Sequence, residues 1–140
     1  MSASHDQLPE KPRPEYSDEN QPYWDGLREH KLLVQRCGGC NTLRHYPRPL
    51  CDGCYSLEYD WTELSGSGKV HSWTVSHHPF HPGFKRETPY VTVTVDLAEG
   101  LRLQGVLEGN DASALAIGRE VELTFNDVDA ELTLPGFRLV

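Results

Sequence analysis

The chain has 140 residues, a hydrophobic content of 37% and a formal net charge of -8, which suits one domain with a modest core and a small appendage. It has no apolar run long enough to span a membrane, and its start, MSASHDQLPEKPRPEY, lacks the basic and apolar regions of a signal peptide. We therefore expect a cytoplasmic protein without a membrane partner. The acidic balance also argues against a nucleic-acid partner, because binding a phosphate backbone requires a basic surface.

The first 19 residues differ from the rest in amino-acid composition. They are rich in Pro, Glu, Ser and Asp and offer little that could be buried. This composition is typical of a flexible arm, either disordered or ordered only on a partner. We accordingly divide the chain into an N-terminal arm (1–19), a helix plus a cysteine-rich segment (20–60) and a main domain (61–140).

The segment NQPYWDGLREHKLLVQR predicts a helix over residues 21–30, followed by a short strand. Asn20 can cap this helix, and a proline in the first turn lacks only a donor that would be unpaired anyway. Tyr23, Trp24 and Leu27 then share one face. They can pack in the core of the chain or anchor another protein, and both interpretations stay open at this point.

All four cysteines lie in CGGCNTLRHYPRPLCDGC, as two Cys-x-x-Cys pairs: Cys37 with Cys40, and Cys51 with Cys54. Two such pairs are typical of a structural zinc site, in which four thiolates surround the metal tetrahedrally. Iron accepts the same ligands, so the residues do not separate the two metals. A redox role would need a low-pKa thiolate in a βαβ setting, for which this segment gives no sign. If the site closes, no cysteine remains as a nucleophile.

Beyond Trp61 the pattern predicts five strands, in GKVHSWTVSH, PYVTVTVDLAEG, LRLQGVLEG, REVELTFNDV and ELTLPGFRLV. In the first of them, strict alternation puts Val70, Ser72 and Thr74 on one face. A short helical candidate, DASALA, lies between the third and fourth strands, as in an OB fold. The predicted fold class is mainly β: a five-stranded OB-type barrel preceded by a short helix and a four-cysteine zinc ribbon.

The connection between the first two predicted strands, HHPFHPGFKRE, holds three histidines: His77, His78 and His81. They could bind a catalytic zinc, or one could act as a general base. Such imidazoles usually have carboxylate neighbours, and this loop offers only Glu87. A loop with exposed or backbone-bonded histidines is therefore favoured.

Phe84, Lys85 and Arg86 end the same connection. An aromatic ring beside two cations can stack on an adenine and hold a phosphate, which makes these three residues candidates for binding coenzyme A. A solvated loop with a buried phenylalanine is the simpler alternative.

Several motifs carry a family resemblance that covers about residues 20–140. They are the PYWDGL helix, the LLVQRC approach to the first cysteine, the PRP turn between the cysteine pairs, the SGSGKV strand start and the PYV strand start. In these the chain resembles the acyl-CoA-associated OB-fold proteins with a rubredoxin-like zinc ribbon, long labelled only as a domain of unknown function. The resemblance implies that all four cysteines bind structural zinc and that no organic cofactor belongs to the chain itself.

Members of that family look like partner subunits of thiolase-like enzymes, including the aldolases that shorten CoA-linked steroid side chains. The resemblance implies a heterotetramer with such a subunit, with acyl-CoA at the interface and with the helix and ribbon facing the partner. The candidate partner contacts are Tyr23, Trp24, Leu27, Arg44, His45 and Arg48.

The expected function is thus a non-catalytic accessory subunit of a thiolase-fold acyl-CoA enzyme that cleaves or forms carbon–carbon bonds, completing or shielding the CoA channel. One alternative is a single-stranded nucleic-acid-binding module, which the charge opposes: residues 61–140 carry six Lys and Arg against eleven Asp and Glu. The other is a hydrolase with a second metal on the three loop histidines.

Overall fold

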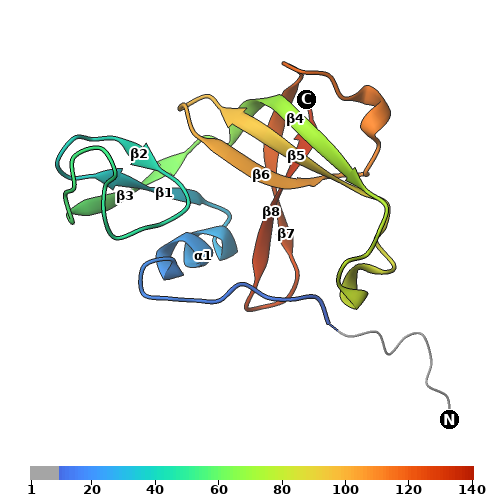
Figure 1. Ribbon diagram of the computed structural model, residues 1–140, viewed down its shortest axis with the longest axis horizontal. Coiled ribbons are helices and arrows are strands. Elements are labelled where there is room, and N and C mark those ends of the chain that lie inside the picture. The colour runs from blue at the N-terminus through green and yellow to red at the C-terminus, as the bar shows by residue number, and fades with distance from the viewer. Residues whose placement is uncertain (1–9) are drawn as a thin grey trace, which may run out of the picture.

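The computed structural model describes residues 10–140, so the part of the predicted arm at 1–9 lies outside the described residues. Figure 1 shows a small sheet and a helix beside a larger barrel. The helix and the small sheet comprise α1 (Gln21–Arg28), β1 (Leu32–Cys37), β2 (Leu43–Arg44) and β3 (Tyr59–Leu64). The barrel comprises β4 (Ser67–Ser76), η2 (Pro82–Phe84), β5 (Tyr90–Leu97), β6 (Arg102–Leu107), η3 (Ala112–Ala114), β7 (Glu120–Asp127) and β8 (Thr133–Leu139). No helix within residues 10–140 is long and apolar enough to cross a bilayer.

The barrel is closed in the strand order β4-β5-β6-β8-β7, with β4 also paired to β7. Its pairs are antiparallel except for the parallel pair β6 and β8. Five strands in this order form an OB-type barrel, with η3 where the short helix was expected. The predicted fold class is confirmed.

A β-bulge in β4 alters the predicted alternation. The register with β5 shifts between Val70 and Ser72, so one residue of β4, His71, lacks a partner opposite it. Val70 is buried, and after the bulge Trp73 and Val75 are the residues that pack against the core. The expectation that Val70, Ser72 and Thr74 share a face is therefore wrong, because the extra residue inverts the facing of every side chain after it.

The helix begins at residue 21 as predicted, but its N-terminal cap and its C-terminal end differ from the prediction. The side chain of Asn20 makes no cap hydrogen bond; instead its Oδ1 accepts from the backbone of Ser17 at 2.7 Å. At the other end, the N–H of Glu29 donates to Gly26 O, and His30 takes a left-handed conformation with φ 59°. The helix consequently ends at Arg28, two residues before the predicted end.

The ribbon and the barrel share one core. The buried cluster joins Leu27 of α1 and Val34 of β1 to Val93 of β5 and Phe137 of β8. Figure 1 shows α1 lying beside the lower part of β7 and β8. The predicted boundary between residues 60 and 61 falls inside β3, which pairs along its whole length with β1.

Residues 10–13 follow the barrel surface, and the residues after them pass beside α1, where Tyr16 packs edge-on against Trp24. Lys11 forms an ion pair with Glu87 at 2.8 Å, and Arg13 forms one with Asp129. A methyl group added to Gly83 would lie 2.7 Å from the backbone nitrogen of Lys11, so glycine at that position permits this close contact. This part of the arm thus bridges the β4–β5 and β7–β8 connections.

Candidate metal centre and neighbouring surfaces

The two Cys-x-x-Cys pairs fold into matching turns. In the first, Gly39 N–H donates to Cys37 Sγ at 3.3 Å; in the second, Gly53 N–H donates to Cys51 Sγ at 3.4 Å. A backbone hydrogen bond closes each turn: Asn41 N–H donates to Cys37 O, and Tyr55 N–H donates to Cys51 O. Asn41 and Tyr55 both have positive φ. The β1 strand delivers the first cysteine, so the sheet positions one turn against the other.

The four sulfur atoms gather at one point, all within 4.8 Å of one another. Cys37 Sγ lies 3.5 Å from Cys54 Sγ, and Cys40 Sγ lies 3.7 Å from Cys51 Sγ. A zinc ion with bonds of about 2.3 Å to four sulfurs separates them by about 3.8 Å. The arrangement therefore fits a tetrahedral metal.

Without a metal the thiols of this site shift in opposite directions: despite a backbone hydrogen bond from Ser56, contacts with the other cysteines raise the pKa of Cys54, whereas that of Cys37 falls. The backbone hydrogen bond from Cys40 lowers the pKa of the Cys37 thiol, and it outweighs the burial that raises it. A metal needs its ligands as thiolates. Among residues 10–140, these four cysteines are the only group of three or more potential ligands close enough to share an ion.

Arg44 supports the segment between the two turns. Its Nε donates to Gln35 Oε1 at 2.7 Å and its Nη2 to the carbonyl of Arg48 at 2.9 Å, while the guanidinium carbon lies 5.1 Å from the centroid of the Tyr59 ring. The Gln35 oxygen also accepts from the backbone of Arg48 at 2.9 Å. Arg44 is buried, so it ties the proline turn to the sheet and offers little surface to another protein.

His45 packs against Tyr23, with ring centroids 5.0 Å apart. Its burial lowers its pKa to about 4, against about 6.5 in an unfolded chain. Between these values, the unfolded state takes up a proton that the folded state does not, so stability falls as the pH drops.

We expect His45→Asn to reduce this loss. Measured by urea unfolding at pH 7 and pH 5, the wild type should lose about 2 kcal/mol more than the variant over this interval. Acid weakening of the metal site affects both proteins alike, so their difference isolates the imidazole. Equal losses in the two proteins would contradict the assignment.

The six residues predicted to contact a partner differ in how much of each side chain is exposed. Tyr23 and Leu27 are 2% and 0% exposed and, like Arg44, belong to the interior, so their predicted contact with a partner does not fit the structure. They share the helix face that packs on β1 of the small sheet and on β8 of the barrel. Trp24 is half-buried and donates from Nε1 to Tyr46 Oη at 3.0 Å. Of the six, Arg48 is the exposed one, and His45, like Trp24, is half-buried.

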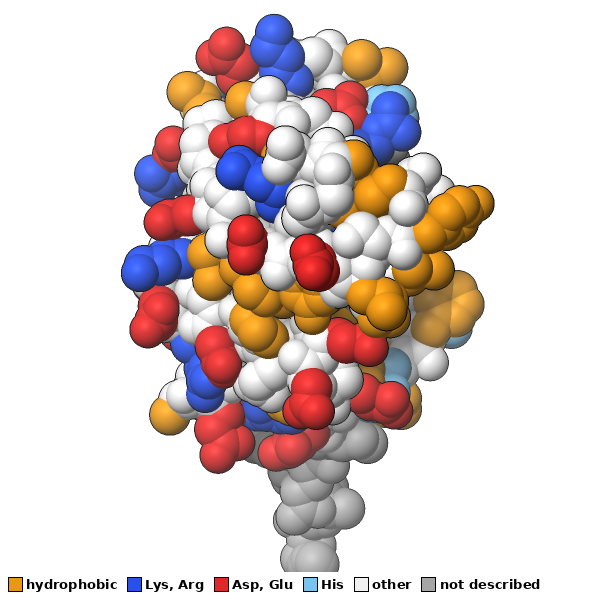
Figure 2. Space-filling view, turned by 90° about the vertical axis from the view of Figure 1, so that its left-hand side faces the viewer, with side chains coloured by type: hydrophobic (Ala, Val, Ile, Leu, Met, Phe, Trp, Pro, Cys, Tyr) orange, Lys and Arg blue, Asp and Glu red, His pale blue; other side chains and the backbone are white. Residues whose placement is uncertain are grey.

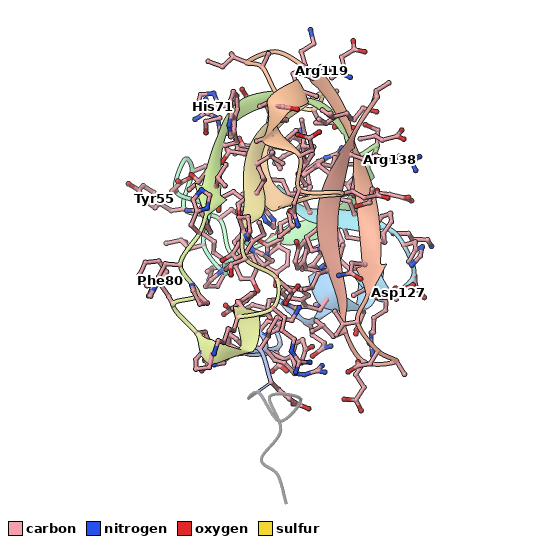
Figure 3. The ribbon with its side chains drawn as sticks, turned by 90° about the vertical axis from the view of Figure 1, so that its right-hand side faces the viewer. Tyr55, His71, Phe80, Arg119, Asp127 and Arg138 are labelled. Atoms are coloured by element: carbon pink, nitrogen blue, oxygen red, sulfur yellow. The ribbon has the colours of Figure 1, made fainter. Side chains whose placement is uncertain are left out.

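Other residues supply exposed apolar surface near the metal centre. Tyr55 and Leu57, just after the last cysteine, are 73% and 70% exposed, and Phe80 in the β4–β5 connection is 90% exposed. Figure 1 shows that the ribbon loop with Tyr55 and the β4–β5 connection with Phe80 lie at opposite ends of the molecule, so Phe80 is separate from the surface near the metal centre, although Figure 3, which looks along the long axis, shows both pointing outward. Figure 2 shows further hydrophobic side chains crossing the ribbon end as a band flanked by acidic groups. The sequence did not predict this surface, because no local pattern marks Tyr55 or Leu57 as exposed.

The three histidines of the β4–β5 connection do not form a common metal site. His77 and His78 are exposed, while His81 Nδ1 accepts from the backbone of Gly83 at 2.9 Å. None of the three belongs to a potential metal cluster within residues 10–140. The hydrolase alternative, which needs a second metal on these residues, therefore finds no site.

The three predicted CoA-binding residues lie at η2. Phe84 is half-buried, and its ring contacts Lys11, whose Nζ is 5.7 Å from the centroid, and Tyr90, at a centroid distance of 5.7 Å. Lys85 and Arg86 follow it and are exposed. Lys11, from the N-terminal arm, thus places a cation over this ring.

Family models match both parts of the chain: the rubredoxin-like zinc ribbon domain of ChsH2 over residues 24–60, and the C-terminal OB-fold domain of ChsH2 over residues 61–126. A DUF35 domain-containing scaffold protein of Methanocaldococcus jannaschii is 31% identical over 107 residues, 75% of each chain. The chain belongs to the DUF35 family. The predicted resemblance is confirmed, and the zinc ribbon model together with the sulfur cluster supports a structural zinc site.

Other DUF35 relatives are larger. A probable enoyl-CoA hydratase alpha subunit of Thermomonospora curvata is 43% identical over 128 residues, which is 91% of this chain and 40% of that protein. The 3-oxo-4,17-pregnadiene-20-carboxyl-CoA hydratase alpha subunit of Mycobacterium tuberculosis is 38% identical over 115 residues, 82% of this chain and 36% of that protein. The chain thus spans well under half the length of these two relatives.

A solved structure in the family is similar over nearly its whole length. It is titled Ltp2-ChsH2(DUF35) aldolase; its matching chain is 42% identical, with a TM-score of 0.82, and the match covers 91% of this chain and 98% of that one. The OB barrel and the ribbon are therefore arranged alike in the two proteins.

Proposed function

We propose that this chain is a non-catalytic accessory subunit of a thiolase-fold acyl-CoA enzyme. The partner would supply the nucleophile and base, and this chain would order the active-site loops and exclude water. The observation that carries the proposal is the exposed apolar surface at the ribbon end (Figure 2), where Tyr55 and Leu57 are 73% and 70% exposed close to the four-cysteine cluster. Contiguous apolar surface of this kind is typical of a docking site for another protein.

The names of relatives support the same role. Besides the aldolase complex, a benzoylsuccinyl-CoA thiolase subunit BbsA of Geobacter metallireducens is 34% identical over 97 residues, 69% of this chain and 63% of that protein. We infer a heterotetramer that cleaves or forms a carbon–carbon bond in a CoA thioester, for example the retro-aldol shortening of a steroid side chain. Zinc, rather than iron, is the metal we assign to the ribbon, and Lys85 and Arg86 are our candidates for contacts to the CoA phosphates.

Co-expression with thiolase-fold proteins of the same organism tests the proposal. One of them should co-elute with this chain, and the acyl-CoA should turn over only in that complex. Turnover by this chain alone, or full activity of the thiolase-fold protein without it, would contradict the proposal.

The docking surface has its own test. We expect Tyr55→Asp and Leu57→Asp each to weaken co-elution by at least about tenfold in dissociation constant, because each buries a charge in an apolar interface. Ile117→Asp is the matched control: Ile117 is 79% exposed in the η3–β7 connection, which belongs to the barrel and not to the ribbon. If all three variants bound equally, the interface would lie elsewhere.

A further inference from the structure

A groove opens between β6 and β8. These parallel strands pair at only two positions, Val106 with Gly136 and Leu107 with Phe137, although β6 begins at Arg102 and β8 at Thr133. The two strands therefore diverge toward their N-terminal ends. The space between them has a volume of about 660 Å³, within the range of about 300 to 1,000 Å³ typical of ligand sites.

Glycines hold the strands together at the closed end of the groove. A Cβ added to Gly105 would lie 3.1 Å from Gly136 Cα, and one added to Gly136 would lie 2.8 Å from Thr124 Oγ1. Larger residues there would push β6 and β8 apart. The wedge shape of the groove thus follows from two residues without side chains.

Aromatic side chains line the open part of the groove. Phe84 and Tyr90 lie with ring centroids 5.7 Å apart and an interplanar angle of 32°. On the β7 side, Phe125 lines the groove while His30 stacks on its ring at 4.8 Å and 8°. The imidazole is in turn held by Asp127, 2.9 Å from its Nε2. The walls are therefore positioned before any ligand binds.

The groove is nearly uncharged. Among the described residues that line it, Glu108 alone is charged; the polar groups are those of Tyr90, Thr92, Gln104, Thr124 and Asn126. Beside it, Lys11 is paired with Glu87 and Arg13 with Asp129. A lining with a single carboxylate and no cation is unlike the basic grooves with which OB folds hold single-stranded nucleic acid.

We propose that this groove binds an uncharged, flat ring group, namely the ring portion of an acyl substrate. The identity of the ligand rests on the proposed function; the preference for rings rests on the groove itself. Stacking between aromatic groups adds about 0.5 to 1.5 kcal/mol beyond the burial of area, which a straight alkyl chain cannot gain. Val106, 46% exposed on the wall, is the residue that such a ring would cover.

The test uses the zinc-loaded full chain without any partner, so it can fail or succeed independently of the co-expression experiment. 2-Naphthol serves as the ring probe and n-octanol as the chain probe, with binding followed by amide chemical shifts. We expect 2-naphthol to shift the signals of Gly105, Val106 and Gly136 and to bind several-fold tighter than n-octanol. Val106→Arg should weaken 2-naphthol binding by on the order of tenfold, whereas Ile117→Arg should leave it unchanged.

Three results would overturn the proposal. The first is a set of 2-naphthol shifts located outside the groove, or no shifts at all. The second is equal binding of the ring and chain probes, and the third is equal loss in both arginine variants. If 2-naphthol binds as expected but the chain does not assemble with a thiolase-fold protein, the groove stands and the assignment of its ligand as an acyl substrate falls.

Discussion

Replacing Cys37 with serine is expected to release the metal and unfold the ribbon. Cys37 is completely buried, ends β1 and contributes one of four sulfurs within 4.8 Å of one another. Zinc binding supplies about 10 to 16 kcal/mol in isolated zinc-finger peptides, so its loss should lower the melting temperature by more than about 10 °C. Elemental analysis should find one zinc per wild-type chain and none in the variant.

Thr42→Ala is the matched control for this experiment. It removes the Thr42 hydroxyl that lies 3.1 Å from Cys40 Sγ but leaves all four thiols in place. The control should keep its zinc and nearly all its stability. A serine variant that retained a full equivalent of metal would contradict the four-cysteine site, and iron in the wild type would correct our choice of metal.

Leu27→Ala is expected to lower the free energy of unfolding by about 3 kcal/mol, since truncating a fully buried leucine leaves a cavity. Leu27 is 0% exposed in the cluster that joins α1 to the barrel. Chemical denaturation measures the loss, which should also reach the barrel because the core is shared.

The neighbouring exposed residue provides the control. Arg28→Ala removes an ion pair to Asp25 one turn earlier, a kind of contact worth only a few tenths of a kcal/mol. Should Leu27→Ala keep its stability but lose co-elution with a partner, Leu27 would return to the interface where the sequence had placed it.

Local chemistry made the main elements predictable. Runs of β-branched residues specify the strands because their side chains pack on a pleated surface, and β5 from Tyr90 to Leu97 is such a run. Two Cys-x-x-Cys pairs specify the metal centre, because each turn needs only its own few residues to aim two sulfurs.

The candidate surfaces were predicted less well. The helix pattern grouped Tyr23, Trp24 and Leu27 on one face, and the structure buries Tyr23 and Leu27 of that face within the chain, in the core that the small sheet and the barrel share. A periodic apolar face indicates burial without naming what covers it. Likewise, nothing local distinguishes the exposed Tyr55 from a buried aromatic residue.

The sequence by itself determined the number and order of the barrel strands and the four metal ligands, since each depends on residues close together in the chain. It also determined the acidic net charge, which depends on composition alone. Only the tertiary structure decided that His71 lies at a bulge, that Arg44 is enclosed with Gln35, and that β6 and β8 diverge into a groove. These features depend on contacts between segments far apart in the chain, and such contacts are set by the packing of the whole core rather than by local preference.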